Sequence, residues 1–325
     1  MTTTATAPDQ QEEPQEVRKP RKAGKWSRSA WLRRAPLLPA LVFTIVVTQI
    51  PFLLTVFYSF QSWNLVRPGS RHFVGFRNYA YVFTDSQFRT AMLNTVVLTV
   101  VCVFVAMLLG LGLALLLDRK FLGRGVVRTL LITPFLILPA AGALLWKTTM
   151  FDPTYGLLNF VLGTEVDWLS QYPLASVMTQ IVWQWTPFMM LLILAGLQGQ
   201  SKEVLEAAAV DGAGKWRIFV SITLPQLSRY LQLAALLGAI YIVNSFDAIY
   251  LMTQGGPGTA STNLPYYIYQ RAFEGFDVGQ SSAMGVIVVL LTLVVATFAL
   301  RWLFRSYGVS EVRCCGSAVV SAGGF

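Results

Sequence analysis

The sequence predicts an all-α membrane protein that crosses the bilayer six times. Of its 325 residues, 54% are apolar and 13% are charged, whereas soluble globular proteins carry about a quarter charged residues. A helix needs roughly 17 to 25 apolar residues to cross a bilayer. Six stretches without charge reach that length alone or with short flanks: Ala35–Val66, Thr90–Leu117, Thr129–Trp146, Trp168–Ser201, Tyr230–Phe246 and Val278–Leu300.

The distribution of Lys and Arg predicts the orientation. With the N-terminus inside, the cytoplasmic segments are 1–34, 118–128, 198–229 and 301–325, and they hold 19 of the 25 Lys and Arg residues. Because short cytoplasmic loops are enriched in these residues, we expect both termini in the cytoplasm. The net charge of +9 therefore follows from topology. No basic stripe alternates with exposed aromatic residues, so we expect no nucleic-acid partner.

The expected spans follow from the apolar stretches and their breakers. Pro134 and Pro139 are expected to bend the third span. In the second span, Ala106, Gly110 and Ala114 recur at four-residue spacing, which lets helices pack closely. The apolar tract Leu157–Leu162 is too short to cross, so we expect it at the interface or in a re-entrant segment. The spans are Leu37–Phe60, Ala91–Leu117, the segment from Gly125 to about Trp146, Leu174–Leu197, Tyr230–Met252 and Ser282–Phe304.

Three regions follow along the chain. Residues 1–34 are polar and rich in Gln, Glu, Pro, Lys and Arg, so we expect a disordered cytoplasmic segment. Residues 35–308 form the six-helix domain, which includes the inside loop 198–229, and residues 309–325 form a short cytoplasmic tail. Cys314 and Cys315 lie in that tail, where acylation and an inert tail are the two interpretations.

Catalytic motifs are absent from the sequence. We find no phosphate-binding loop, no HExxH, no nucleophile elbow and only one histidine. The three cysteines have no metal-binding or disulfide spacing. We therefore expect a protein that is not an enzyme and holds no metal or cofactor. If it moves a solute uphill, the energy must come from a partner or from an ion gradient.

One acidic residue, Asp247, lies inside a predicted span. Such residues usually face a cavity or the bundle interior, so Asp247 is a candidate acceptor for a hydroxylated solute or half of a proton relay. It could instead reach water near the outer end of its helix. No second acid occurs in any span, which disfavours the relay. Asn244, Asp247 and Tyr250 are three residues apart and are expected to share one face of a continuous helix.

The inside loop 198–229 predicts two short amphipathic helices. Ser201 begins the first, and Glu203 and Glu206 favour its N-terminal dipole. Gly212 and Gly214 end it, and a second helix covers about Lys215–Ile222. Pro225 stands where the next span begins, a position that tolerates proline. The residues leave two interpretations open, a docking site for a partner and an interfacial linker.

Residues 206–225 resemble the EAA motif of bacterial ABC-importer permeases. Glu206-Ala207-Ala208, three residues, Gly212, nine residues and then Ile222-Thr223-Leu224-Pro225 reproduce that motif. The resemblance implies the type I importer permease fold and a loop that fits a cleft on an ATP-binding subunit, which would hold the ATP. The implied coupling residues are Glu206, Ala207, Ala208, Asp211, Gly212, Ile222, Leu224 and Pro225.

Further strings resemble the carbohydrate-importer branch of these permeases. They include Gly75–Tyr79, Phe246-Asp247, Thr253–Thr259, Tyr269, Phe273 and Asp277–Gly279, while WNLVRPG, LPAAGALLWK and GGPGTASTN look closest to sorbitol/mannitol permeases. The resemblance implies a bacterial inner-membrane subunit that imports a sugar or polyol. The implied partners are a second permease subunit, two ATP-binding subunits and an extracytoplasmic solute-binding protein.

Two alternatives compete with this hypothesis. The first is a stand-alone secondary transporter for a small polar solute, although no inverted repeat is visible in the sequence. The second is a membrane scaffold that recruits an ATPase without moving a solute.

Overall fold

The computed structural model describes residues 38–315, and it describes their side chains except at 295, 298–300 and 302–315. The segment 1–34, the end of the tail and the side chains of Cys314 and Cys315 thus lie outside the described residues. Contacts divide the chain into a unit ending at Leu53 and a unit from Leu54 to Phe325. Apart from residues 38–53, the features below belong to the second unit.

The described chain is helical apart from one small hairpin, which confirms the predicted all-α class. The long helices are α2 (Leu38–Ser59), α4 (Ser86–Asp118), α5 (Arg124–Leu136), α9 (Pro173–Gln198), α12 (Leu224–Ile242) and α15 (Val278–Cys315). The short helices are α3 (Arg77–Thr84), α6 (Pro139–Leu145), α7 (Leu157–Leu162), α8 (Trp168–Gln171), α10 (Lys202–Val210), α11 (Lys215–Ile218), α13 (Asp247–Met252) and α14 (Leu264–Tyr269). Three π-helical turns, η2 (Trp146–Met150), η3 (Phe219–Thr223) and η4 (Gln270–Glu274), and the strands β1 (Gln61–Ser62) and β2 (His72–Phe73) complete it.

Within the described residues, three helices are long and apolar enough to cross a membrane, namely α2, α4 and α9. The bent pair formed by α5 and α6 with η2 makes a fourth if it counts as one span. In α15 the described apolar part, Val278–Val294, is shorter. The predicted number of six spans therefore stays a prediction.

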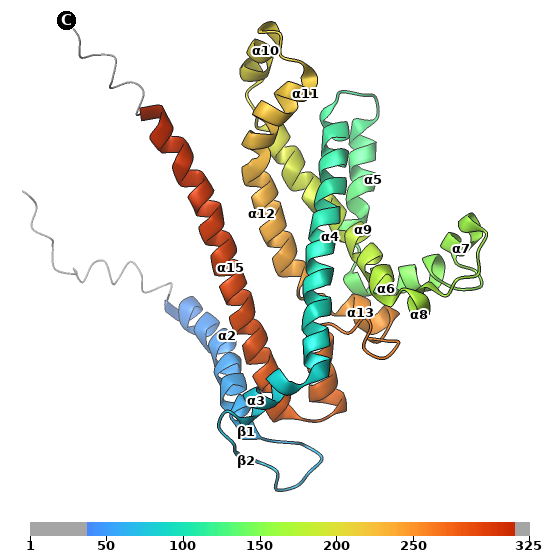
Figure 1. Ribbon diagram of the computed structural model, residues 1–325, viewed down its shortest axis with the longest axis vertical. Helices are drawn as coiled ribbons and strands as arrows, with labels where there is room; N and C mark the ends of the chain where they lie inside the picture. Colours follow the sequence, from blue (N-terminus) through green and yellow to red (C-terminus); the bar gives the residue numbers. More distant parts are fainter. Residues whose placement is uncertain (1–37, 316–325) are drawn as a thin grey trace, which may run out of the picture. The chain divides into compact units, whose positions relative to one another are not determined.

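The core of the second unit forms where α4 packs along α9, with α12 against both (Figure 1). Ala106, Gly110 and Ala114 are all buried in α4, which confirms the predicted small-residue face. A Cβ at Gly110 would lie 2.9 Å from the backbone nitrogen of Met190 on α9. The absence of a side chain therefore sets how closely these two helices approach.

The third predicted span is interrupted. The axes of α5 and the segment 139–150 meet at 98°, with the break at Ile137 and Leu138. Pro134 lies in the last turn of α5, and Pro139 is the first residue of α6. Proline removes a backbone donor and restricts the preceding residue, so the bend expected from the two prolines is confirmed.

The fifth predicted span is also interrupted, and here the expected continuous helix Tyr230–Met252 is wrong. Helix α12 ends at Ile242, and α13 begins only at Asp247. The Asn263 side-chain amide donates to the carbonyl of Ser245 at 2.5 Å. The Asn244 amide donates to Ile240 at 2.7 Å. In a continuing helix, the carbonyls of Ile240 and Ser245 would instead accept from backbone N–H groups four residues further along the chain.

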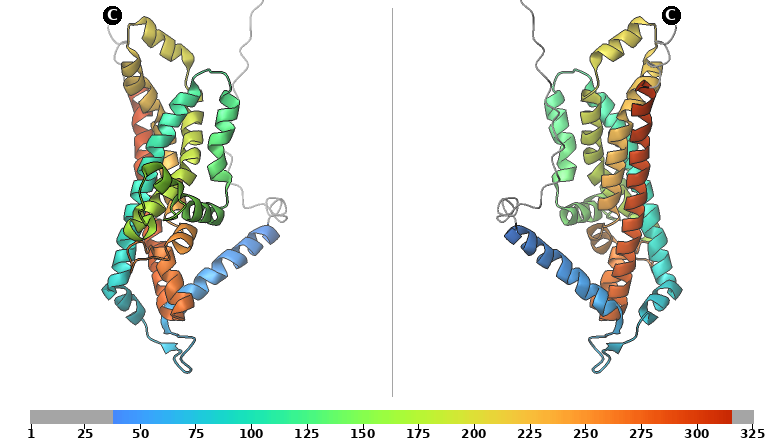
Figure 2. Two further views of the ribbon diagram at one scale, coloured as in Figure 1. Left: turned by 90° about the vertical axis from the view of Figure 1, so that its right-hand side faces the viewer. Right: turned by 90° about the vertical axis from the view of Figure 1, so that its left-hand side faces the viewer.

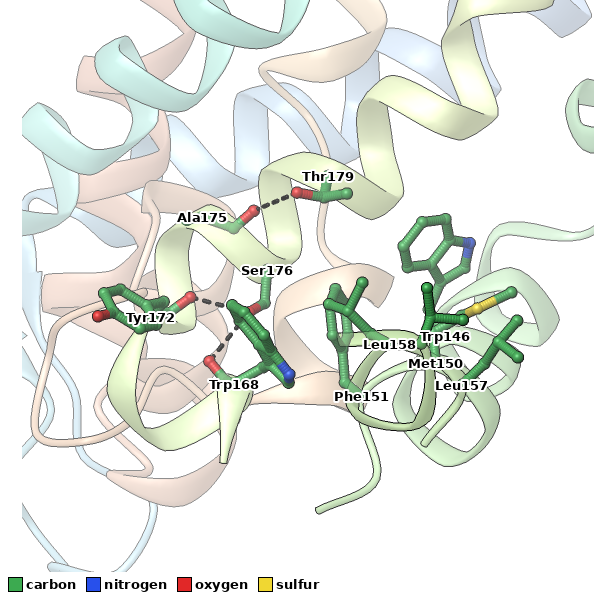
Figure 3. A pocket seen from close by; sticks show the side chains of 11 residues that line it. Trp146, Met150, Phe151, Leu157, Leu158, Trp168, Tyr172, Ala175, Ser176 and Thr179 are labelled. Carbon is green, nitrogen blue, oxygen red and sulfur yellow. Dashed lines mark hydrogen bonds between the residues drawn. The ribbon is translucent and has the colours of Figure 1, made fainter. Parts of the chain in front are cut away.

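The segment between η2 and α9 is held by polar side chains. Asn159 of α7 donates to the carbonyls of Pro153 and Val166, and its oxygen accepts from the Trp168 indole at 2.8 Å. The Ser176 hydroxyl of α9 lies 2.9 Å from the carbonyl oxygens of Trp168 and Tyr172 (Figure 3). These bonds fix α7 and α8 against the first turns of α9.

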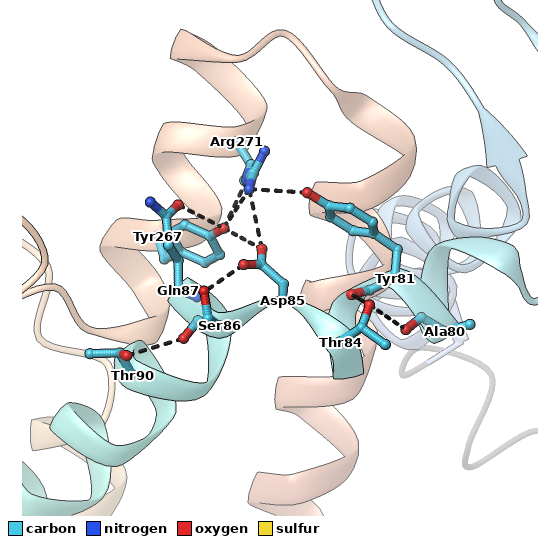
Figure 4. A network of polar contacts seen from close by, with 9 residues as sticks. All are labelled: Ala80, Tyr81, Thr84, Asp85, Ser86, Gln87, Thr90, Tyr267 and Arg271. Carbon is cyan, nitrogen blue, oxygen red and sulfur yellow. Dashed lines mark hydrogen bonds and ion pairs between the residues drawn. The ribbon is translucent and has the colours of Figure 1, made fainter.

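A second polar network ties the start of α4 to η4 (Figure 4). Asp85 caps α4 by accepting from the backbone of Gln87, and it pairs with Arg271 at 3.2 Å. The Tyr267 hydroxyl donates to Asp85 at 2.5 Å and accepts from Arg271. Burial, followed by the hydrogen bond to Asp85, raises the pKa of Tyr267 to about 12. The phenol therefore keeps its proton and stays a donor at neutral pH.

The two ends of the second unit carry different loops. The turn between α4 and α5 and the pair α10–α11 lie at one end (Figures 1 and 2). The β1–β2 hairpin lies at the opposite end. This separation matches the sides assigned to these loops from the charge distribution.

Candidate solute cavity and docking loop

A small cavity of about 120 Å³ lies between the two interrupted helices. Pro139, at the α5–α6 break, lines it from one side. The residues of the α12–α13 break line it from the other, and α9 supplies the wall between them. The lining comprises Pro139, Gln180, Ile181, Gln184, Trp185, Tyr241, Asn244, Ser245, Phe246, Asp247 and Ala248.

Two glutamines of α9 give this cavity polar groups within a span. The Gln184 amide donates to the carbonyl of Ile137 at 3.0 Å, and Gln180 donates to Gln184 at 2.9 Å. The Gln184 bond satisfies a carbonyl freed by the α5–α6 break. The side-chain oxygen of Gln180 is buried and has no hydrogen-bond partner among the described residues. An unpaired buried acceptor is costly, and this one belongs to a residue of the cavity wall.

The structure brings Asn244 and Asp247 to this cavity, but by a different route from the one predicted. They do not share a helix face, because Asn244 lies in the break and Asp247 begins α13. Both side chains are exposed and line the cavity. Because Asp247 is exposed, its carboxylate can accept hydrogen bonds without the cost of being buried in a helix bundle.

Tyr250, the third residue of the predicted set, does not line the cavity. Its ring stacks on Phe246 with centroids 5.2 Å apart and lies edge-on to Tyr269 at 5.4 Å. The predicted common face of the three residues is wrong because α12 ends at Ile242, which separates Asn244 from the helix α13 that holds Asp247 and Tyr250. A role for Tyr250 in the solute path stays a prediction.

Of the eleven lining residues only Asn244 and Asp247 were predicted for the site, and those missed include Gln180, Gln184, Trp185 and Tyr241. Two amides four residues apart inside a charge-free stretch are a usable signal, because polar groups within a span usually face the interior. Trp185 and Tyr241 stack at 5.2 Å and join Phe135 and Phe188 in one aromatic cluster. No sequence pattern links these four rings, since they come from three helices.

The inside loop contains two short helices joined at a glycine corner. Helix α10 ends with Asp211 as its C-cap, and Gly212 follows with φ +80°. The Gly212 N–H donates to the carbonyl of Ala209 at 3.1 Å, and the Ala213 N–H donates to that of Ala208 at 3.0 Å. This pair of bonds is the Schellman motif, which requires a left-handed residue at the position of Gly212.

The stems of this loop are held together by α9 and α12. The Gln200 amide donates to the carbonyl of Thr223 at 3.1 Å. A Cβ at Gly196 would lie 2.6 Å from ring atoms of Tyr230, so the two helices approach closely where the loop leaves the bundle. The two ends of the loop that carries the glycine corner are therefore held close together by α9 and α12.

The eight residues expected to couple are placed in and beside the two short helices. Glu206, Ala207, Asp211, Gly212 and Pro225 are exposed, while Ala208, Ile222 and Leu224 are half-buried. Trp216 is exposed and contacts Phe219, with centroids 5.8 Å apart. The loop thus offers acidic and apolar groups together at one end of the second unit.

The comparisons with known proteins are consistent across sequence and structure. The family model for the binding-protein-dependent transport system inner membrane component matches residues 106–308. The sulfoquinovosyl glycerol transport system permease protein SmoG of Agrobacterium fabrum is 37% identical over 82% of this chain and 88% of its own length. The trehalose transport system permease protein SugA of Mycobacterium tuberculosis is 34% identical over 83% and 88%.

A solved structure gives the same fold. It is a bacterial alginate ABC transporter in complex with an alginate pentasaccharide-bound periplasmic protein. One of its chains superposes with a TM-score of 0.73 at 23% identity, covering 84% of this chain and 93% of that one. This likeness confirms the predicted fold of an ABC importer permease.

Proposed function

Because the chain belongs to the family of inner membrane components of binding-protein-dependent transport systems, we propose that it lines the path of an ATP-driven carbohydrate importer. Members of this family are non-catalytic, multi-pass membrane subunits. In this proposal the loop 198–229 couples the chain to a separate ATPase on the cytoplasmic side, where both termini also lie.

The observation that carries the proposal is the cavity between the two interrupted helices. Transporters bind solutes where helices are broken, because free backbone groups and helix ends are available there. Asp247 and the Gln180 oxygen can accept hydrogen bonds from hydroxyl groups. Trp185 and Tyr241 supply the apolar and aromatic surface that small-molecule sites combine with a few polar groups.

The size of the cavity supports a second permease subunit. Its volume of about 120 Å³ is below the roughly 300–1,000 Å³ of most small-molecule sites. A similar subunit that faces this one would supply the rest of the path, and a heterodimer is the expected form. An extracytoplasmic solute-binding protein would deliver the solute, as the periplasmic protein of the alginate complex suggests.

The docking loop supports the proposed power source. Glu206, Ala207 and the corner at Gly212 would enter a cleft on an ATP-binding subunit, with small alanines that allow close approach. Two such subunits would bind the ATP, and this chain would hold no cofactor. Closure of the ATPase pair would move the loop and, through the stems braced at Gln200, rock the helices around the cavity.

The solute class is a carbohydrate, and two subclasses are separable by experiment. The relatives are named for transport of trehalose and of sulfoquinovosyl glycerol. The strings WNLVRPG, LPAAGALLWK and GGPGTASTN resemble sorbitol/mannitol permeases instead. The aromatic cluster of four rings beside the cavity favours a solute with a ring, because flat side chains contact ring faces better than a linear polyol.

The function is tested by reconstitution. We expect the tagged chain, purified from its source cells with the subunits that accompany it, to take up labelled trehalose in proteoliposomes only when ATP and the solute-binding protein are present. Sorbitol and mannitol are assayed in parallel. Uptake driven by a proton or sodium gradient with the chain alone would establish a secondary transporter. Docking and ATP hydrolysis without flux of any carbohydrate would indicate a scaffold.

Replacing Asp247 with asparagine is expected to weaken solute uptake. Hydrogen bonds that involve a charged group contribute about 1.5–3 kcal/mol. We therefore expect the KM for uptake to rise by roughly 10- to 100-fold, because 1.4 kcal/mol corresponds to a factor of ten. The measurement is the initial uptake rate as a function of solute concentration.

Asp118→Asn provides the matched control. Asp118 is an exposed carboxylate at the end of α4 and lies outside the cavity. Its variant should keep the wild-type KM. Equal KM values for both variants would remove Asp247 from the proposed solute site.

A further inference from the structure

A second, larger cavity lies at the start of α9, away from the proposed solute site. Its volume is about 520 Å³, within the roughly 300–1,000 Å³ range of small-molecule sites. Three of its residues belong to the first turns of α9, which places it at one edge of a membrane-spanning helix (Figure 3). The lining comprises Trp146, Met150, Phe151, Leu157, Leu158, Val161, Trp168, Tyr172, Ala175, Ser176 and Thr179.

Three of the polar side chains of this wall form hydrogen bonds inside the protein. The Trp168 indole donates to Asn159 at 2.8 Å, and the Thr179 hydroxyl donates to the carbonyl of Ala175 at 2.8 Å. The Ser176 hydroxyl is bound to the carbonyls described above. The Trp146 indole nitrogen has no hydrogen-bond partner among the described residues, but it is buried and therefore not offered to an occupant. What the cavity offers to an occupant is mainly hydrocarbon and aromatic surface.

Helix α7, beside the cavity, has the reverse of the polarity of a soluble helix. Its buried residue is Asn159, which is 5% exposed. Phe160 and Val161 are 84% and 70% exposed. Five hydrogen bonds hold the Asn159 side chain inside the protein. Because this side of α7 faces inward, Phe160 and Val161 on the other side face outward. A patch of this kind marks contact with lipid or with another protein.

The segment that supplies most of the lining is acidic, and the nearby Lys147 of η2 donates to the carbonyl of Leu251 at 3.0 Å. Residues 151–180, which supply most of the lining, contain Asp152, Glu165 and Asp167 but no Lys or Arg. Backbone hydrogen bonds from Tyr155 and Thr154 lower the pKa of Asp152, so it stays ionised at neutral pH. An anionic group at the mouth would be repelled, and an ammonium group would be attracted. Trp168 and Tyr172 are the residue types enriched at headgroup depth.

We propose that this cavity binds an acyl chain of a membrane phospholipid whose headgroup carries an amine, as in phosphatidylethanolamine. The chain lies against Leu158, Val161 and the exposed side of Ala175. The ammonium group meets the carboxylates of the 151–180 segment. The bound lipid covers apolar surface that α7 presents outward and steadies the segment that leads from η2 into α9.

A second polypeptide fits this cavity less well than a lipid. Protein interfaces carry about one hydrogen bond per 100–200 Å², and they need donors and acceptors that are free to pair across the contact. The bonds of Trp168, Ser176 and Thr179 leave few such groups on the wall. An acyl chain needs none.

The test uses photo-crosslinking in the assembled transporter. The full-length chain, with its accompanying subunits, is placed in nanodiscs of phosphatidylethanolamine that carries a diazirine in one acyl chain. After irradiation, adducts are mapped by mass spectrometry. We expect enrichment on peptides 146–161 and 168–179 over the α4 peptide 96–108, which has exposed apolar side chains, such as Val100 and Phe104, but no residue in the cavity.

Filling the cavity with a larger side chain should lower the yield of lipid adduct. Ala175→Trp places an indole in the cavity, and we expect its adduct yield to fall by about tenfold, equivalent to ~1.4 kcal/mol. Ala195→Trp is the matched control, because Ala195 is also exposed on α9 and does not line the cavity. It should keep the wild-type yield. Both variants must elute as monodisperse assemblies.

The headgroup is tested by competition. Unlabelled phosphatidylethanolamine should reduce the adduct more than phosphatidylcholine, and phosphatidylglycerol should compete least. Glu165→Gln should narrow the preference for the ethanolamine lipid over phosphatidylglycerol. The proposal is overturned if Ala175→Trp keeps full yield, if all three lipids compete equally, or if the cavity peptides carry no more adduct than the α4 peptide.

Discussion

Replacing Gly110 with valine is expected to prevent the helix bundle from assembling, and alanine should destabilise it strongly. A Cβ at Gly110 would lie 2.9 Å from the Cβ of Met189, 2.9 Å from the nitrogen of Met190 and 3.2 Å from the carbonyl carbon of Met189. Two of these atoms belong to the backbone of α9, so no rotamer change relieves the clash. Helices α4 and α9 would have to separate.

The size of the effect follows from the cost of overpacking. An extra methyl group in a filled core costs about 1–3 kcal/mol, and more where backbone must move. Native proteins are stable by only about 5–15 kcal/mol. For Gly110→Ala we therefore expect the melting temperature to fall by roughly 5–10 °C, measured by thermal unfolding of the purified chain in detergent. For Gly110→Val we expect little monodisperse protein.

Gly112 supplies the control on the same helix. It is exposed, and a Cβ there meets nothing within 4 Å. Gly112→Ala and Gly112→Val make the same chemical change and carry the same helix propensity terms, so they isolate the contact with α9. Equal behaviour of the Gly110 and Gly112 variants would contradict the packing argument.

Much of the fold was predictable because it depends on local composition. The absence of charge over about 20 residues marked where long helices form, and α4 and α9 follow the predicted spans within a few residues. The spacing of Ala106, Gly110 and Ala114 marked the packed face of α4. Pro134 and Pro139 marked the bend between α5 and α6, since proline acts on its own backbone wherever it stands.

The candidate cavity was only half predictable, because it depends on contacts that are distant in sequence. Tyr230–Phe246 contains no proline, and its one glycine, Gly238, is buried within α12. The break after Ile242 is instead held by Asn263, which reaches Ser245 from 18 residues further on. No local signal reports that bond. Asp247 was found as a lone acid, while Asn244 was wrongly placed on one helix face with it because a continuous helix was assumed.

Replacing Gly212 with valine is expected to uncouple ATP hydrolysis from transport while the protein still folds. Gly212 has φ +80°, and a Cβ there meets nothing within 4 Å. The effect therefore comes only from the backbone. A left-handed conformation costs an ordinary residue about 1–2 kcal/mol, and a β-branched residue suffers most. The Schellman bonds to Ala208 and Ala209 would break, and α11 would leave α10 at another angle.

The measurement is the number of ATP molecules hydrolysed per solute imported. We expect Gly212→Val to lower import by about tenfold or more, the factor that corresponds to 1.4 kcal/mol, with near-normal yield and melting temperature. Gly212→Asn is the matched control, because asparagine adopts the left-handed conformation at small cost. It should retain most of the import. Wild-type coupling in the valine variant would exclude the glycine corner from the coupling path.

Gly212→Asp then separates shape from charge. Aspartate also tolerates the left-handed conformation and nearly matches asparagine in size, so the two variants differ mainly in one negative charge. The corner already carries Asp211, with Glu206 on the same short helix, and both are exposed. If the loop enters a cleft on an ATPase, a further charge must be desolvated there, and import should fall for aspartate but not for asparagine. If the loop only links α9 to α12 at the membrane surface, the added charge stays in water and both variants should transport alike. The aspartate–asparagine difference therefore reports docking itself, independently of whether the corner keeps its shape.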